Sequence, residues 1–212
     1  MTVQPASIHR TPVQRFWHWL YRLLGWDGEY HHPDTEKFII IVAPHTSNLD
    51  FFIGFIYSRA FALPFPNFLA KDSLFRGPFG WVWRWLGGIP VNRGERTNFV
   101  DQVAAEFQKR DRMVLAITPE GTRSKSEYWK TGFYHMAMKA NVPVIMAYID
   151  YAQKFISCGD VAEITGDIEA DMTKIRDYYA NVTARHPHRH GDIRFRSAVN
   201  ETSVFDDRPG DA

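Results

Sequence analysis

Apolar residues along this chain gather in short β-branched runs that alternate with longer stretches of helical spacing. The short runs predict buried strands, and the longer stretches predict helices. The predicted strands lie near residues 37–43, 67–71, 88–91, 113–118 and 143–149, with further candidates at 154–158 and 161–165. The predicted helices lie near residues 48–61, 74–86, 98–110, 131–140 and 171–184. This alternation predicts an α/β fold with a mainly parallel sheet flanked by helices.

A further short helix is predicted near the start of the chain, from Pro12 to Leu24. Its apolar residues share one face, and no acidic residue occurs between Ile8 and Leu24. Tryptophan and arginine together are typical of amphipathic helices that lie among lipid headgroups. The same apolar stripe could instead pack on the domain's own core, and both interpretations stay open.

Composition and charge limit the function classes. The formal net charge of +1 gives no support for a nucleic-acid partner. The single cysteine, Cys158, rules out an internal disulfide and a multi-cysteine zinc cluster, and is expected to be a buried strand residue. The histidine-rich segment 186–190 lacks nearby acidic residues, so we expect it to be solvated and predict no metal site. No apolar stretch reaches the roughly 18 residues of a membrane span, and residues 1–12 do not resemble a signal peptide.

A histidine and an aspartate follow the first strand predicted in the sheet. His45 lies just after the run 37–43, and Asp50 falls in the first turn of the next predicted helix. Ligands bind at the carboxyl ends of strands in open α/β sheets. A histidine there, with a carboxylate to hold its ring, is equipped to take a proton from a hydroxyl. A structural role is the alternative, because Asp50 also suits the positive end of a helix.

Three further blocks accompany this pair along the chain. They are Gly87-Gly88-Ile89-Pro90-Val91-Asn92-Arg93, Ile117-Thr118-Pro119-Glu120-Gly121-Thr122-Arg123-Ser124 and Val142-Pro143-Val144-Ile145-Met146-Ala147-Tyr148-Ile149. Together with the His-X4-Asp block, and in this order over residues 38–149, they resemble the glycerolipid acyltransferase family. Each block alone is a weak signal, whereas the ordered set is specific.

The resemblance implies an O-acyltransferase that moves a fatty acyl group from an acyl thioester to the free hydroxyl of a lyso-glycerophospholipid. The donor would be acyl-CoA or an acyl-carrier protein, and the favoured acceptor is 1-acyl-glycerol-3-phosphate, which would give phosphatidic acid. By the resemblance, His45 and Asp50 are catalytic, and the acceptor site is lined by Arg93, Glu120, Gly121, Thr122 and Arg123. A thioester is already activated, so no cofactor or metal is expected.

Direct transfer is expected, without a covalent acyl-enzyme, because the sequence has no Gly-X-Ser-X-Gly elbow and Cys158 lies outside the matched blocks. Three positions depart from the family pattern: Pro44, Thr118 and Asn92 stand where asparagine, phenylalanine and an acidic residue are common. These departures suggest a divergent branch and leave the acceptor open. A lyso-lipid without phosphate, such as a lyso-aminolipid, is therefore an alternative acceptor, although the two arginines favour an anionic one.

The chain shows neither an internal repeat nor a linker, so we expect one acyltransferase domain over residues 1–212. Within it, we expect a membrane-surface segment at 1–30, the catalytic core at 37–165 and a polar tail at 185–212. The expected partners are both substrates, a membrane surface and an acyl-carrier protein, with the protein cytoplasmic and peripheral on the inner face of the cell membrane. A thioesterase and a non-catalytic peripheral lipid-binding protein are the competing functions.

Overall fold

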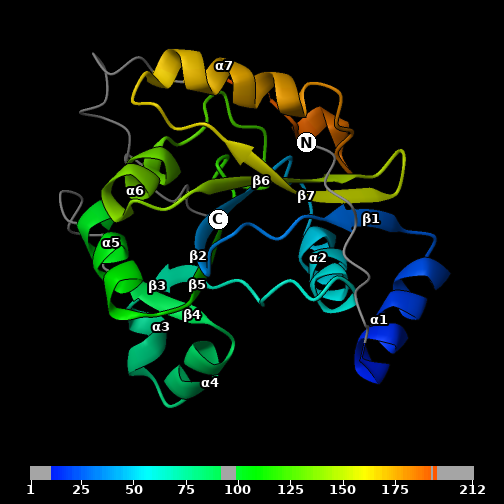
Figure 1. Cartoon of the computed structure of the whole chain (residues 1–212), viewed down its shortest axis with the longest axis horizontal. Coiled ribbons are helices and arrows are strands. Elements are labelled where there is room, and N and C mark those ends of the chain that lie inside the picture. The colour runs from blue at the N-terminus through cyan, green and yellow to red at the C-terminus, as the bar shows by residue number, and fades with distance from the viewer. Residues whose placement is uncertain (1–10, 92–98, 192, 195–212) are drawn as a thin grey trace, which may run out of the picture.

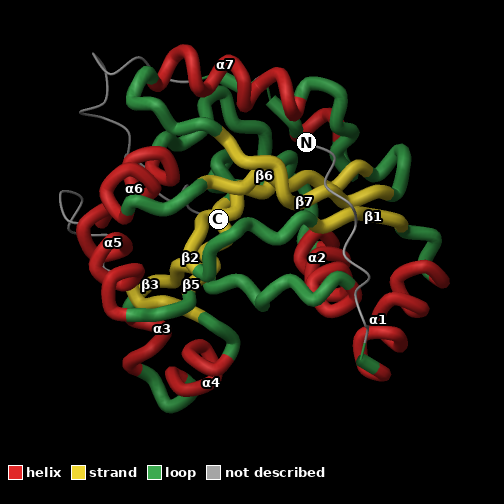
Figure 2. Tube along the Cα trace, in the orientation of Figure 1, coloured by secondary structure: helices red, strands yellow, loops and turns green. Residues whose placement is uncertain are grey.

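A computed structural model describes residues 11–91, 99–191 and 193–194 of the chain. Among these residues, five strands form a central sheet in the order β1-β7-β6-β2-β5 (Figures 1 and 2). The strands are β1 (Asp27–Tyr30), β2 (Lys37–Val42), β5 (Met113–Ile117), β6 (Val144–Asp150) and β7 (Phe155–Ala162). β2 runs parallel to both β5 and β6, β7 returns antiparallel to β6, and β1 lies parallel to β7.

Two more strands extend this sheet beyond β5. β3 (Phe68–Lys71) and β4 (Gly88–Val91) pair in parallel. Asn67, just before β3, forms a parallel bridge to Leu115 in β5, and its carbonyl accepts a hydrogen bond from the N–H of Ala116 at 2.9 Å. The β3–β4 pair therefore continues from the edge of the central sheet.

Helices cover both faces of the sheet, because β2 is apolar on both sides. Ile39 and Ile41 are fully buried in the core cluster that includes side chains of α5 (Phe99–Lys109), α6 (Gly132–Ala140) and α7 (Ile168–Tyr179). Phe38 and Ile40 face the other way, into the cluster with α1 (Pro12–Leu23) and α2 (Leu49–Ala60). In Figure 1, α7 lies above the strands and α1 and α2 below them. The predicted α/β fold with a mainly parallel sheet flanked by helices is confirmed.

The predicted helix over residues 74–86 is two short helices, α3 (Ser73–Arg76) and α4 (Gly80–Trp85). Gly77 ends α3 in an extended conformation, with ψ at 173°. Pro78 accounts for the break, because proline disfavours the helical conformation in the residue before it and has no N–H to donate.

The last third of the chain also differs in detail from the predicted boundaries. The two strand candidates at 154–158 and 161–165 are one strand, β7. The helix predicted at 171–184 begins earlier, because the Asp167 side chain accepts from the N–H of Ala170 at 3.2 Å and caps it. β1 was not predicted, since its four residues are mostly polar and β7 supplies its pairing.

The helix α1 packs on the core with one face and exposes the other. Tyr21 is fully buried, and the ring of Trp17 meets Phe55 of α2 edge-on at 5.7 Å. Four other apolar side chains of α1 are more than half exposed, namely Val13, Phe16, Trp19 and Leu23. Within the described ranges, no helix has the length and apolar character needed to cross a membrane.

The described part of the tail contacts the domain on either side of Pro187, His188 and Arg189, which are exposed as expected for the histidine-rich segment. Ile193 is 6% exposed within the main core cluster, and the carbonyl of Arg194 accepts from the N–H of Trp129 at 2.9 Å. Nearer the histidines, the N–H of His186 donates to the hydroxyl of Thr46 at 3.1 Å. One buried apolar side chain and two backbone contacts thus hold this segment in place.

Candidate active site

The histidine at the end of β2 meets the aspartate at the start of α2. β2 ends at Val42, and α2 begins at Leu49 after a six-residue loop. His45 lies in that loop, and its Nδ1 is 3.0 Å from Oδ2 of Asp50 in the first turn of α2. Asp50 is 4% exposed, whereas His45 is only partly buried. The structure therefore brings together the two residues that we expected to be catalytic.

Four groups surround the Asp50 carboxylate. Its Oδ2 accepts from the backbone N–H groups of Thr46 and Ser47 at 3.1 and 3.0 Å, and its Oδ1 accepts from the Tyr151 hydroxyl at 2.6 Å. Burial alone would raise the pKa of this carboxyl group, but hydrogen bonds from His45, Tyr151 and Ser47 outweigh burial and lower the pKa. Asp50 is therefore ionised at neutral pH.

An ionised Asp50 determines the tautomer of His45. A carboxylate can only accept a hydrogen bond, so Nδ1 of His45 carries the proton and Nε2 carries the lone pair. The lone pair of Nε2 can then take a proton from a hydroxyl. Because the pKa of Asp50 is lowered in the folded chain, its contribution to stability is present at neutral pH and is lost as the pH falls through that lowered pKa.

Glu120, in the loop after β5, contacts the backbone of the His45 loop. Both of its carboxylate oxygens lie 3.1 Å from the backbone nitrogen of His45, which donates to them. Its side chain is 7% exposed, and His190 Nδ1 lies 3.9 Å from its Oε1. Buried carboxylates need such donors. Glu120 therefore holds the His45 loop against the loop after β5, and it is not among the residues that line the cavity.

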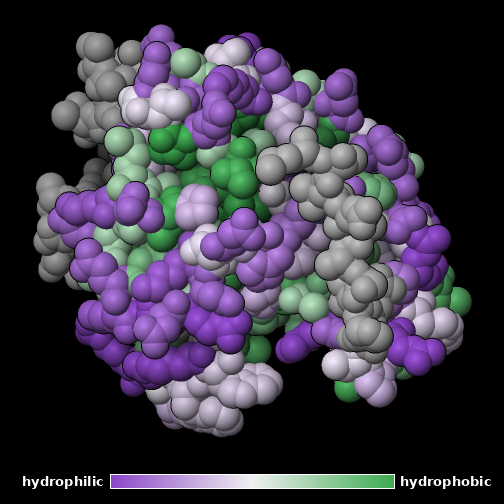
Figure 3. Space-filling model, viewed as in Figure 1, coloured by the Kyte–Doolittle hydropathy of each residue, from purple (hydrophilic) through white to green (hydrophobic). Residues whose placement is uncertain are grey.

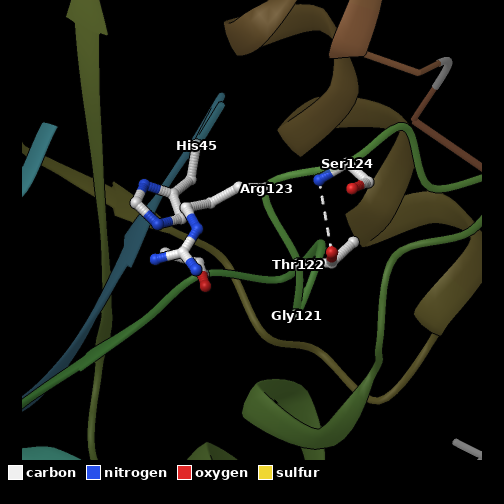
Figure 4. A pocket seen from close by; sticks show the side chains of 6 residues that line it. His45, Gly121, Thr122, Arg123 and Ser124 are labelled. Atoms are coloured by element: carbon white, nitrogen blue, oxygen red, sulfur yellow. Dashed lines mark hydrogen bonds between the residues drawn. The ribbon is translucent and has the colours of Figure 1, made fainter. Parts of the chain in front are cut away.

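A cavity of about 400 Å³ opens beside His45. It is lined by His45, Thr118, Gly121, Thr122, Arg123 and Ser124. Figure 4 shows the guanidinium group of Arg123 next to the His45 ring, with Thr122 and Ser124 further along the same loop. Arg123 also donates to the side-chain oxygen of Asn48. A cation and a base thus face one space.

Gly121 makes the turn of this loop possible. Its φ is +66°, and a Cβ atom added there would lie 2.8 Å from the Lys130 side chain. A residue with a side chain would be strained at this φ and crowded at this position. Within the same tight loop, the N–H of Ser124 donates to the Thr122 hydroxyl at 3.2 Å.

Of the seven site residues expected from the sequence, Arg93 lies outside the described residues. The structure brings Gly121, Thr122 and Arg123 to the cavity beside His45. Sequence analysis missed Tyr151, because this residue lies just beyond the last motif block. Its hydrogen bond to Asp50 joins residues that are 101 positions apart. Asn48 was also missed as a partner of Arg123, although it lies inside the first block. Among the described residues, no group of three or more His, Cys, Asp or Glu side chains could hold a metal ion.

The fold and the site define an α/β protein that holds a His–Asp pair at the carboxyl end of its central parallel strand. The acyltransferase family model matches residues 28–150, which include this pair and the cavity loop. The chain therefore belongs to the acyltransferase family.

Curated relatives carry a more specific name. The chain is 31% identical over 143 residues to a 1-acyl-sn-glycerol-3-phosphate acyltransferase of Haemophilus influenzae, which covers 63% of this chain and 58% of the relative. It is 32% identical over 133 residues to the protein of that name in Escherichia coli, covering 58% and 52%. A mouse relative, 1-acyl-sn-glycerol-3-phosphate acyltransferase alpha, is 28% identical over 137 residues, covering 61% and 46%. The chain thus spans about half the length of these relatives. No solved structure matches it significantly.

Proposed function

We propose that this chain is an O-acyltransferase that moves a fatty acyl group from acyl-CoA or acyl-carrier protein to the free hydroxyl of a lyso-glycerophospholipid. The favoured acceptor is 1-acyl-glycerol-3-phosphate, the substrate in the names of the relatives. The observation that carries the proposal is the His45–Asp50 pair beside a cavity that also holds Arg123.

Transfer proceeds with His45 as general base. Nε2 takes the proton of the acceptor hydroxyl while the hydroxyl oxygen attacks the thioester carbonyl carbon. Asp50 stabilises the imidazolium that forms, as the aspartate of a catalytic triad does. The C–S bond then breaks, and the thiolate leaves with the proton from His45 as a free thiol. The substrate hydroxyl stands in for an enzyme serine, so no acyl-enzyme is needed.

The buried cysteine supports this direct route. Cys158 lies in β7 and is 1% exposed, in agreement with the predicted buried strand position. Burial raises the pKa of its thiol to about 12. The nucleophile would be the thiolate, and this thiol stays protonated at neutral pH and out of contact with solvent. Cys158 is therefore a core residue in the proposed mechanism.

The test of the proposed function is thiol release from a long-chain acyl-CoA by the full chain, with and without 1-acyl-glycerol-3-phosphate. Release that depends on the acceptor, with phosphatidic acid as the product, supports the transferase. Release without any acceptor identifies a thioesterase instead. If acyl-CoA gives no release, acyl-carrier protein is the second donor to use, and failure with both donors contradicts the proposal.

Arg123 is the proposed partner of the acceptor phosphate. Arg123→Ala is expected to raise the KM for 1-acyl-glycerol-3-phosphate about 10- to 100-fold with little change in kcat, because a hydrogen-bonded ion pair formed in the ground state is lost. Initial rates over a range of acceptor concentrations measure this. The exposed Arg189, which does not line the cavity, gives the control variant Arg189→Ala. An unchanged KM in Arg123→Ala would assign the phosphate to other residues.

The proposed membrane contact rests on the exposed apolar face of α1. This face combines Phe16 and Trp19 with Arg15, and the sequence has no acidic residue from Ile8 to Leu24. A second exposed aromatic group lies on and before α4, with Phe79, Trp81 and Trp85 each more than 65% exposed. Figure 3 shows pale and green side chains at the lower end of the molecule, where Figure 1 places α4 and α1. Aromatic and basic residues together fit an anionic lipid surface.

Vesicle sedimentation tests this contact. The full chain is expected to sediment with vesicles of phosphatidylglycerol and phosphatidylcholine. The double variant Phe16→Ala/Trp19→Ala is expected to bind at least about ten-fold more weakly, because it loses the aromatic area that the contact would bury in lipid. The matched control is Met138→Ala/Val161→Ala, which removes two apolar side chains that are just over half exposed on α6 and β7. Equal binding by both double variants would exclude α1 as the contact.

A further inference from the structure

A tyrosine outside the motif blocks completes the hydrogen bonding of Asp50. The His45 ring and two backbone N–H groups all bind Oδ2 of this carboxylate. The other oxygen, Oδ1, accepts from the Tyr151 hydroxyl at 2.6 Å. Because the Asp50 side chain is only 3% exposed, water has little access to replace a lost donor. Tyr151 therefore holds the side of the carboxylate that faces away from His45.

The Tyr151 ring is itself fixed on several sides. It follows β6 directly, and its backbone N–H donates to the carbonyl of Thr183 at 2.9 Å. Its ring meets Trp26 edge-on, with 5.1 Å between centroids, and the guanidinium of Arg185 lies 5.6 Å from its centre. The turn after it is held by Asp150, whose Oδ1 accepts from the next two backbone N–H groups. The hydroxyl thus reaches Asp50 from a rigid support.

We propose that Tyr151 is a positioning residue for acyl transfer: its hydroxyl fixes the Asp50 carboxylate, and through it the ring of His45. This inference rests on the proposed function. Tyr151 touches neither substrate in this scheme. It acts because the orientation of Asp50 determines where the lone pair of His45 points, and a small misplacement of a base lowers the rate of proton transfer.

The ionisation states agree with this role. Among the residues that the structure describes, three titratable side chains interact with Asp50: His45 from the loop before α2, Tyr151 from the β6–β7 turn and His186 from the tail. Burial and the bond to Asp50 raise the pKa of the Tyr151 hydroxyl well above its usual range, so it remains a neutral donor. Removing it takes away a hydrogen bond to the charged form of Asp50, which raises the pKa of that carboxyl group.

The variant Tyr151→Phe in the full chain tests the proposal. We expect kcat to fall about ten-fold with KM within two-fold of wild type. We also expect the pKa of the Asp50 carboxyl group to rise, because a hydrogen bond to its charged form is lost. In the unliganded chain, the midpoint of the Asp50 carboxyl titration, followed by carbon-13 NMR, is expected to rise in the same direction.

The matched control is Tyr57→Phe, which removes the same atom from a buried tyrosine in the core cluster against which Tyr151 packs. The Tyr57 hydroxyl donates to the carbonyl of Glu29 at 2.5 Å and does not contact Asp50. Tyr57→Phe is expected to lower the melting temperature without moving the Asp50 titration. Unchanged titration in Tyr151→Phe would overturn the positioning role. Because that titration needs no substrate, it separates this failure from a wild-type chain that transfers no acyl group.

Discussion

Replacing His45 with alanine is expected to lower the rate of acyl transfer by about 10³-fold or more, because alanine removes the only group proposed to take the acceptor proton. The His45 side chain is 20% exposed and lines the cavity, so solvent can enter the space that the ring leaves. We therefore expect His45→Ala to fold with a melting temperature close to that of wild type. Acceptor-dependent thiol release, measured at saturating substrates, gives the change in kcat.

The control for this variant is His135→Ala, which removes an exposed histidine from α6. It is expected to keep the wild-type rate. A His45→Ala chain that binds acceptor normally but transfers no acyl group supports the general base. If it instead retains more than a tenth of the wild-type rate, another group takes the proton and the proposed mechanism fails.

Asp50→Asn is expected to lower kcat about 10²-fold, by removing charge while keeping shape. Three donors converge on Oδ2, so the asparagine oxygen will occupy that position and keep the His45 tautomer. Its amide nitrogen then faces Tyr151, whose hydroxyl can turn and accept. The substitution therefore isolates the negative charge that stabilises the imidazolium during transfer.

Steady-state rates and thermal unfolding together test the Asp50→Asn prediction. The KM for the acceptor should stay within a few-fold of wild type, because Asp50 does not line the cavity. Asp167→Asn is a useful comparison, since it makes the same atomic change at the cap of α7, far from His45 in the chain. Wild-type rates in Asp50→Asn would reduce Asp50 to a structural cap of the His45 loop.

The parts of the fold that sequence analysis predicted are those with a local signal. The run 37–43 is apolar at every position but one, and it forms β2 between two other parallel strands. His45 and Asp50 are five residues apart, so their pairing depends mostly on one loop and one helix turn. Local periodicity was sufficient to predict β2, and spacing was sufficient to predict the His45–Asp50 pair.

The parts that sequence analysis missed depend on distant contacts. Glu120 reaches the backbone of His45 across 75 residues, and only the pairing of β2 with β5 places their loops side by side. β1 is a strand because β7 offers it a partner, which its own residues do not indicate. The phosphate role proposed for Arg123 likewise depends on where its side chain lies beside the cavity, which the sequence pattern does not specify.

Two hydrogen bonds from the later part of the chain to the His45 loop and α2 have a consequence for synthesis in the cell. Tyr151 meets Asp50 across 101 residues, and His186 meets Thr46 across 140. Contacts of such long range form late, since the chain must close large loops before they contribute any stability. A nascent chain that has emerged from the ribosome up to residue 150 would contain every motif block but could form neither hydrogen bond. We expect catalytic competence to appear abruptly, once the segment around residue 186 has emerged and docked.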